Sequence, residues 1–193
     1  MVPSVELNRV VDQNKKIHPH KFILWVAIGS IIMMFAGLTS AYIVKREQPG
    51  WTSYSTPIAF YYSTTVMLIS SLTIFLAGKS FRERRMVNYK KLLAATAILG
   101  LVFMLLQWLG FHHLWVTGTT LHGSGAGQFL YIIAGLHALH VFGGVIALFT
   151  LYLRARNVRI RSYNRVPVEV VSTYWHFVDL LWIYLFIFFL MVQ

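Results

Sequence analysis

The last 21 residues of the chain, Thr173 to Gln193, limit its fold more than any other stretch. They are almost wholly apolar and about long enough to cross a bilayer as one helix, which takes roughly 20 residues. The run nevertheless contains His176 and Asp179, about one helical turn apart. A carboxylate in the middle of a bilayer costs a few kcal/mol on insertion scales, so such residues usually face protein. We therefore predict a membrane helix with one polar stripe that faces the rest of the molecule.

The composition of the whole chain agrees with a membrane protein. Of its 193 residues, 57% are hydrophobic and only 12% are charged, whereas soluble domains carry about 25% charged residues. The length leaves room for one compact unit. The absence of cysteine excludes thiolate metal sites and iron–sulfur clusters. The composition therefore predicts an all-α integral membrane bundle.

Polar segments divide the chain into five apolar stretches. We predict a polar N-terminal arm at residues 1–20, followed by a single transmembrane domain at residues 21–193. Pro57 is expected at the first position of the second helix, where proline fits well. The five transmembrane helices are expected at about residues 21–44, 57–79, 92–115, 128–153 and 170–192.

The net charge of +11 has a simpler cause than nucleic-acid binding. With five spans, fifteen of the 17 Lys and Arg residues fall on one side of the membrane. Only Lys45 and Arg46 fall on the other side. Because positive loops stay in the cytoplasm, we expect a cytoplasmic N-terminus, an external C-terminus and no nucleic-acid partner.

The histidines raise the alternative of a haem or di-iron membrane enzyme, because histidine commonly ligates these metals. His137 and His140 lie about one turn apart on one helix face. However, His112, His113 and His122 fall near the outer face, away from the deeper histidines. We therefore expect no catalytic residue, metal or haem in this chain. We expect instead one buried structural polar cluster between the fourth and fifth helices, made of His137, His140, His176 and Asp179.

Three sequence blocks carry a family resemblance. They are YWHFVDLLW at residues 174–182, GLHALHVFGG at residues 135–144 and FAGLTSAY at residues 35–42. The blocks resemble, in order and spacing, subunit III of the haem–copper cytochrome oxidases in its short, five-helix form. The resemblance covers about residues 21–193. Its motif residues are Trp175, Phe177, Trp182, Gly144 and Gln107.

The resemblance implies a subunit of a respiratory cytochrome c oxidase that is not catalytic by itself. Such a subunit packs on subunit I, near subunit II and other subunits of the complex, in the bacterial cytoplasmic membrane. Haem and copper belong to the partner subunits, whereas this chain is expected to hold phospholipid. Its implied role is to support sustained proton uptake and stability during oxygen reduction. Subunit III of a quinol oxidase remains an alternative, because electron donors bind to other subunits.

Two acidic residues that the resemblance implies are missing. The family pattern places a glutamate six residues before the glycine of the FAGL block, where this chain has Ile31. It places another three residues after the glutamine of the third helix, where this chain has Gly110. Neither residue can carry a proton, so the carboxylate-dependent part of the family's role is expected to be absent.

Overall fold

The computed structural model describes residues 19–47, 57–117, 125–156 and 165–192. These residues form five helices, each long and apolar enough to cross a membrane, which confirms the predicted all-α membrane fold. Nearly all of the arm expected at residues 1–20 lies outside the described residues. The helices are α2 (Pro19–Arg46), α3 (Ile58–Arg82), α4 (Met86–Val116), α5 (Gly125–Arg156) and α6 (Arg165–Val192).

The helices extend beyond the apolar stretches, mainly on the side rich in basic residues. Helix α4 begins at Met86 and α6 at Arg165, six and five residues before the expected starts. A helix needs no apolar side chains where it leaves the bilayer, so hydropathy underestimates its length. Pro57 is the N-cap of α3 rather than its first helical residue. Pro167 lies in the first turn of α6, where its missing N–H costs no helical hydrogen bond.

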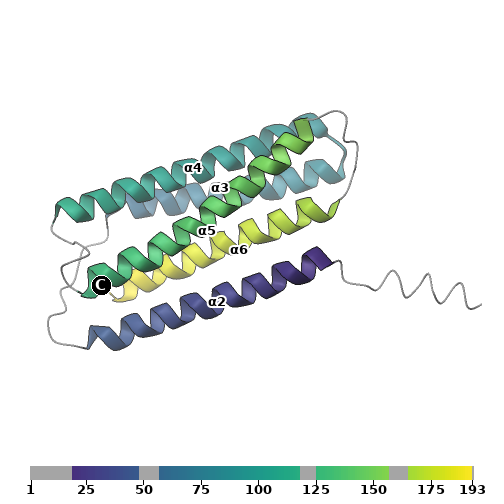
Figure 1. Cartoon of the computed structure of the whole chain (residues 1–193). Coiled ribbons are helices and arrows are strands. Elements are labelled where there is room, and N and C mark those ends of the chain that lie inside the picture. The colour runs from purple at the N-terminus through teal and green to yellow at the C-terminus, as the bar shows by residue number, and fades with distance from the viewer. Residues whose placement is uncertain (1–18, 48–56, 118–124, 157–164, 193) are drawn as a thin grey trace, which may run out of the picture.

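Four of the helices form a closed bundle and the fifth lies beside it. Within the described chain, α3 packs on α4, α4 on α5, α5 on α6, and α6 back on α3. Among the described helices, α2 contacts only α5 and α6, and Figure 1 shows it lying along one side of the bundle. Helix α6 is therefore the one element that touches α2, α3 and α5.

The largest fully buried side chains of the bundle are aromatic. Phe35 and Tyr42 of α2, Phe60 of α3 and Phe103 of α4 are almost completely buried, as is Phe189 of α6. Many other large apolar side chains point outward, which a bilayer accepts because its hydrocarbon is itself apolar. Since lipid gives helices no hydrophobic reason to associate, packing and hydrogen bonds between helices must hold the bundle together.

Candidate functional site

A row of hydroxyl side chains on α3 holds α6 through three hydrogen bonds. The indole N–H of Trp175 donates to Ser70 Oγ over 2.8 Å, and that of Trp182 donates to Thr64 Oγ1 over 3.0 Å. His176 Nδ1 lies 2.7 Å from Ser71 Oγ. We call these contacts the α3–α6 seam. It fixes the two antiparallel helices at a single register.

The sequence reasoning missed the α3 side of this seam, although a signal was present. The pairs Ser63–Thr64 and Ser70–Ser71 recur after seven residues, the same interval that separates Trp175 from Trp182. Seven residues are about two helical turns, so each set lies on one face of its helix. Matching intervals on two apolar helices indicate a hydrogen-bonded pair.

Trp175 joins four helices through one buried side chain. Besides its bond to α3, its ring packs against glycines of α4 and α5. A Cβ added at Gly100 would lie 2.7 Å from Trp175 Cη2, and one added at Gly144 would lie 2.9 Å from Cε3 and Cζ3. Any larger residue would displace the indole, so both glycines serve this close approach.

The remaining motif residues also pack or form hydrogen bonds inside the bundle. Gln107 is buried on α4 and its Nε2 donates to Ser63 Oγ over 2.8 Å. Phe177 is partly buried and packs against the core. The ring of Trp182 lies in edge-on contact with Phe60 and Phe103. Within the described residues, the motif therefore builds the bundle's interior.

His137 lies in an aromatic enclosure. Its side chain is 1% exposed, and its ring centroid lies 6.5 Å from that of Phe35, 5.9 Å from Phe103 and 5.1 Å from Trp182. Neither ring nitrogen has a hydrogen-bond partner in the described chain. His140, one turn further on α5, places Nδ1 2.7 Å from the carbonyl oxygen of Leu136.

Asp179 is buried on α6, with 3% of its surface exposed. Neither of its carboxylate oxygens forms a well-aligned hydrogen bond among the described residues, although the Ser71 hydroxyl lies near enough to interact with it. His176 bonds to Ser71, and His140 bonds to the carbonyl of Leu136. Helix α5 is joined to α6 by Tyr174 Oη, which donates to the His140 carbonyl over 3.1 Å. The single cluster of His137, His140, His176 and Asp179 stays a prediction.

Within the described residues, the outer histidines His112 and His113 form no metal-binding group with the deep ones. The ring centroids of His112 and Trp108 lie 6.3 Å apart. His122 lies outside the described residues. Among the residues that the structure describes, no three His, Asp or Glu side chains are close enough to hold a metal ion. That this chain holds no metal remains a prediction.

The fold and the α3–α6 seam define an integral membrane helix-bundle protein whose interior polar groups join its helices. Residues 54–192 match the family described as cytochrome c oxidase subunit III. The chain is 35% identical to a probable cytochrome c oxidase subunit 3 of Mycobacterium leprae, covering 85% of this chain and 82% of the relative. It is 28% identical to cytochrome c oxidase subunit 3 of Bacillus subtilis, with 86% and 84% covered. The elephant Loxodonta africana protein of that name is 29% identical, with 83% and 64% covered. The chain belongs to the cytochrome c oxidase subunit III family.

Proposed function

We propose that this chain is the subunit III that packs on subunit I of a cytochrome c-oxidising, haem–copper terminal oxidase. It is not catalytic by itself; haem and copper reside in the partner subunits. It shields the flank of subunit I, holds phospholipid against it and keeps proton uptake rapid during oxygen reduction. The observation that carries this proposal is the use of the family's motif residues as internal packing, with Trp175 in contact with three neighbouring helices.

The proposed orientation places the N-terminus in the cytoplasm and the C-terminus outside a bacterial cytoplasmic membrane. Helices α2, α4 and α6 start, and α3 and α5 end, at the basic end of the bundle (Figure 1). The described basic residues at this end include Arg82, Arg85, Arg154, Arg156 and Arg165. The positive-inside rule then assigns this end to the cytoplasm.

The test is to strip this chain from the purified oxidase with detergent and follow oxygen consumption over many turnovers. We expect an unchanged visible spectrum of the redox centres, a near-normal initial rate and a faster decline than in the intact enzyme. The stripped chain should contain no stoichiometric iron, copper or zinc. Immediate loss of haem or copper from the remaining complex would overturn the supporting role.

A further inference from the structure

The outward face of α6 carries a regular stripe of side chains, of which Leu180 and Met191 are 66% and 76% exposed. We call it the α6 outer stripe, and its members are Thr173, Phe177, Leu180, Tyr184, Ile187 and Met191. They follow one another at alternating steps of four and three residues. This is the spacing with which one helix packs along another. Within the described chain, however, no helix covers the most exposed members of the stripe.

The α6 outer stripe lies between two helices that do not meet. Helix α2 borders it through Thr39, whose hydroxyl is 3.0 Å from that of Tyr184. Helix α3 borders it through the bond from Ser71 to His176. Among the described helices, α2 and α3 make no contact with each other.

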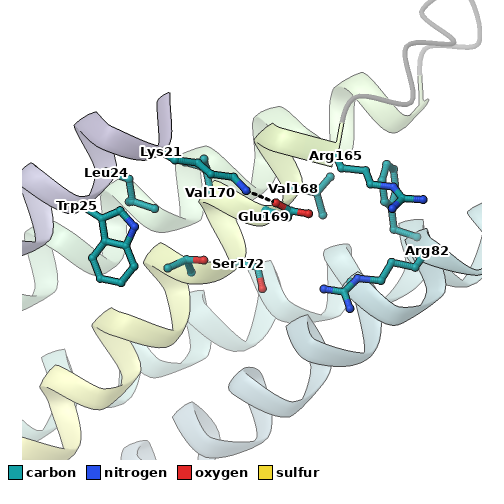
Figure 2. Close-up of a pocket in the computed structure, with 12 residues that line it drawn as sticks. Lys21, Leu24, Trp25, Arg82, Arg165, Val168, Glu169, Val170 and Ser172 are labelled. Carbon is teal, nitrogen blue, oxygen red and sulfur yellow. Dashed lines mark ion pairs between the residues drawn. The ribbon is translucent and has the colours of Figure 1, made fainter. Parts of the chain in front are cut away.

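At the cytoplasmic end, the separation of α2 from α3 is visible as a cavity of about 370 Å³. Its wall consists of residues from the first turns of α2 and α6 and from the last turns of α3. Figure 2 shows Lys21 of α2 and Arg82 of α3 on opposite sides of Glu169. The face of α6 between α2 and α3 is therefore open to a further element.

His176 lies beside the α6 outer stripe, three residues after Thr173 and four before Leu180. Its side chain is half-buried, and its Nδ1 is engaged with Ser71 Oγ. The other ring nitrogen, Nε2, forms no hydrogen bond within the described chain and is not fully buried. One side of the imidazole thus belongs to the α3–α6 seam, while the other is available to a neighbour.

The depth of His176 limits which neighbour can satisfy Nε2. The residue lies seven positions beyond Glu169, whose carboxylate pairs with Lys21 at the charged end of the bundle. At ~1.5 Å per residue, His176 is about 10 Å deeper along the helix. Acyl chains offer no hydrogen-bond partner at this depth, and an unpaired polar group in hydrocarbon is costly.

We propose that the α6 outer stripe binds a transmembrane helix of a neighbouring oxidase subunit, and that a side chain of this helix forms a hydrogen bond with His176 Nε2. The partner side chain carries a hydroxyl, amide or carboxyl group, because these groups join helices inside a bilayer. The inference rests on the proposed packing against a partner subunit. It deepens that proposal by naming the face and the residue that make the contact.

The first test uses two variants that each keep one half of the bonding of the imidazole. In His176→Gln the side-chain amide reaches the position of Nε2, whereas in His176→Asn the shorter amide reaches that of Nδ1. Each oxidase complex is purified and washed with detergent, and the loss of this subunit over time is followed by native mass spectrometry. His176→Leu, which keeps neither bond, is the reference for complete loss of the contact.

We expect His176→Asn to release the subunit about threefold faster than the unaltered complex, the effect of one average hydrogen bond between membrane helices. His176→Leu should behave like His176→Asn, and His176→Gln like the unaltered complex. The opposite order, with His176→Asn retained and His176→Gln released, would assign the effect to the α3–α6 seam and overturn the proposal. Equal retention of all three variants would overturn it as well.

Ser71→Ala is the matched control for the seam. It removes the bond to Nδ1 and leaves Nε2 in place, so the subunit should be retained as in the unaltered complex. Release as fast as in His176→Leu would show that the internal bond, rather than a partner helix, holds the subunit, and would contradict the proposal.

The second test identifies the occupant of the stripe. A photoreactive benzoylphenylalanine replaces Leu180 or Ile187 in the stripe, or the exposed Leu101 of α4 as a control. The purified complex is irradiated, and the crosslinked products are identified by mass spectrometry. At both stripe positions we expect a peptide from one transmembrane segment of another subunit, which should be absent at Leu101.

Crosslinks only to lipid, or only to a second copy of this chain, would overturn the assignment of the stripe to a partner helix. The same peptide at Leu101 would show unspecific capture and would overturn it too. None of these results bears on whether the stripped oxidase keeps its redox centres and loses activity over many turnovers. The two proposals therefore fail separately.

Discussion

At the scale of single residues, the contact between Trp175 and Gly144 gives a sharp prediction. In Gly144→Ala the new Cβ would lie 2.9 Å from the indole, so the ring or α5 must move. We expect a loss of about 1–3 kcal/mol in the free energy of unfolding, the usual cost of overpacking. The neighbouring Gly143→Ala meets only Tyr174 Oη, at 4.0 Å, and should change stability little. Reversible unfolding in mixed micelles, monitored by Trp fluorescence, measures both, and equal effects would contradict the argument.

The positions of the two missing glutamates differ in what surrounds them. A Cβ at Gly110 would lie 2.7 Å from Phe60 Cε1, so an aromatic ring fills the space beside that backbone. Ile31 is partly buried and packs against the core. Both sites are therefore adapted to apolar packing, which a carboxylate would disturb.

We predict that Ile31→Glu gives no gain in oxidase turnover and destabilises the subunit, because it buries an unpaired acid. Gly110→Glu should destabilise more, since the ring of Phe60 must also move. Ile31→Gln and Gly110→Ala separate the charge from the volume. Oxygen consumption per haem and the retention of this subunit during purification are the measurements. A faster or longer-lasting turnover in Ile31→Glu would refute the prediction.

Asp179 and His176 should differ in their response to truncation. Within the described chain, His176 bonds to Ser71, whereas the carboxylate lies near the same hydroxyl without a well-formed hydrogen bond. Removing the carboxylate leaves Ser71 bonded to His176, so Asp179→Leu should be neutral or stabilising. His176→Leu should cost about 0.6 kcal/mol, the average for a side-chain hydrogen bond between membrane helices.

The comparison is made by unfolding both variants in the same micelles, with Asp179→Asn as the control that keeps the shape. If Asp179→Leu costs more than His176→Leu, the carboxylate has a partner, and the predicted polar cluster with His140 and His137 gains support. If Asp179→Leu costs less stability than His176→Leu, as we expect, the carboxylate is dispensable for the fold.

At the scale of elements, the α3–α4 hairpin contains an unusual residue. Arg84 has φ 58°, a left-handed conformation that favours glycine. The N–H of Arg85 donates to the Ser80 carbonyl over 2.9 Å, and that of Arg84 to the Phe81 carbonyl over 3.2 Å. This is the Schellman arrangement, in which the left-handed residue ends the helix.

We predict that Arg84→Gly stabilises the chain by roughly 0.5–1 kcal/mol, because glycine adopts this conformation without steric cost. Arg84→Ala removes the same side-chain charge but keeps the Cβ and should bring no such gain. Thermal unfolding of the two variants decides between them. A gain in Arg84→Ala equal to that in Arg84→Gly would assign the effect to charge rather than to backbone strain.

Hydropathy and charge predicted the number and class of the helices, since a bilayer demands long apolar segments. They could not predict where a helix ends outside the bilayer: the basic stretch around Arg82 to Lys91 reads as a loop, yet only three residues, from Glu83 to Arg85, separate α3 from α4. They also could not predict which helices become neighbours. The polar stripe of α6 is predicted to face α5, yet Trp175, His176 and Trp182 form hydrogen bonds with α3. Hydropathy and charge do not register the matching seven-residue intervals of the α3 hydroxyls and the α6 tryptophans, which are the signal for this pairing.

At the scale of the whole molecule, the charge asymmetry predicts the topology. Fusions of a periplasmic reporter after Arg85 and after Gly125 should report opposite sides of the membrane, because one helix, α4, separates these positions. Arg85 belongs to the basic end and should be cytoplasmic. A reporter active only outside the cytoplasm should therefore work after Gly125 and fail after Arg85. The same result at both positions would contradict the five-span topology.

The peripheral place of α2 has a consequence for biogenesis. Of the five described helices, α2 is synthesised first, and the two that it contacts are synthesised last. Thr39 meets Tyr184, its hydrogen-bond partner at 3.0 Å, only after 145 further residues, which takes roughly ten seconds at typical rates of synthesis. During that interval α2 lies in the bilayer without α6. Helices α3 and α4, by contrast, can pair as soon as both are inserted, because only three residues separate them. Of the five described helices, the first to be inserted is thus the last to be anchored to the others, and their bundle is complete only once α6 has been made.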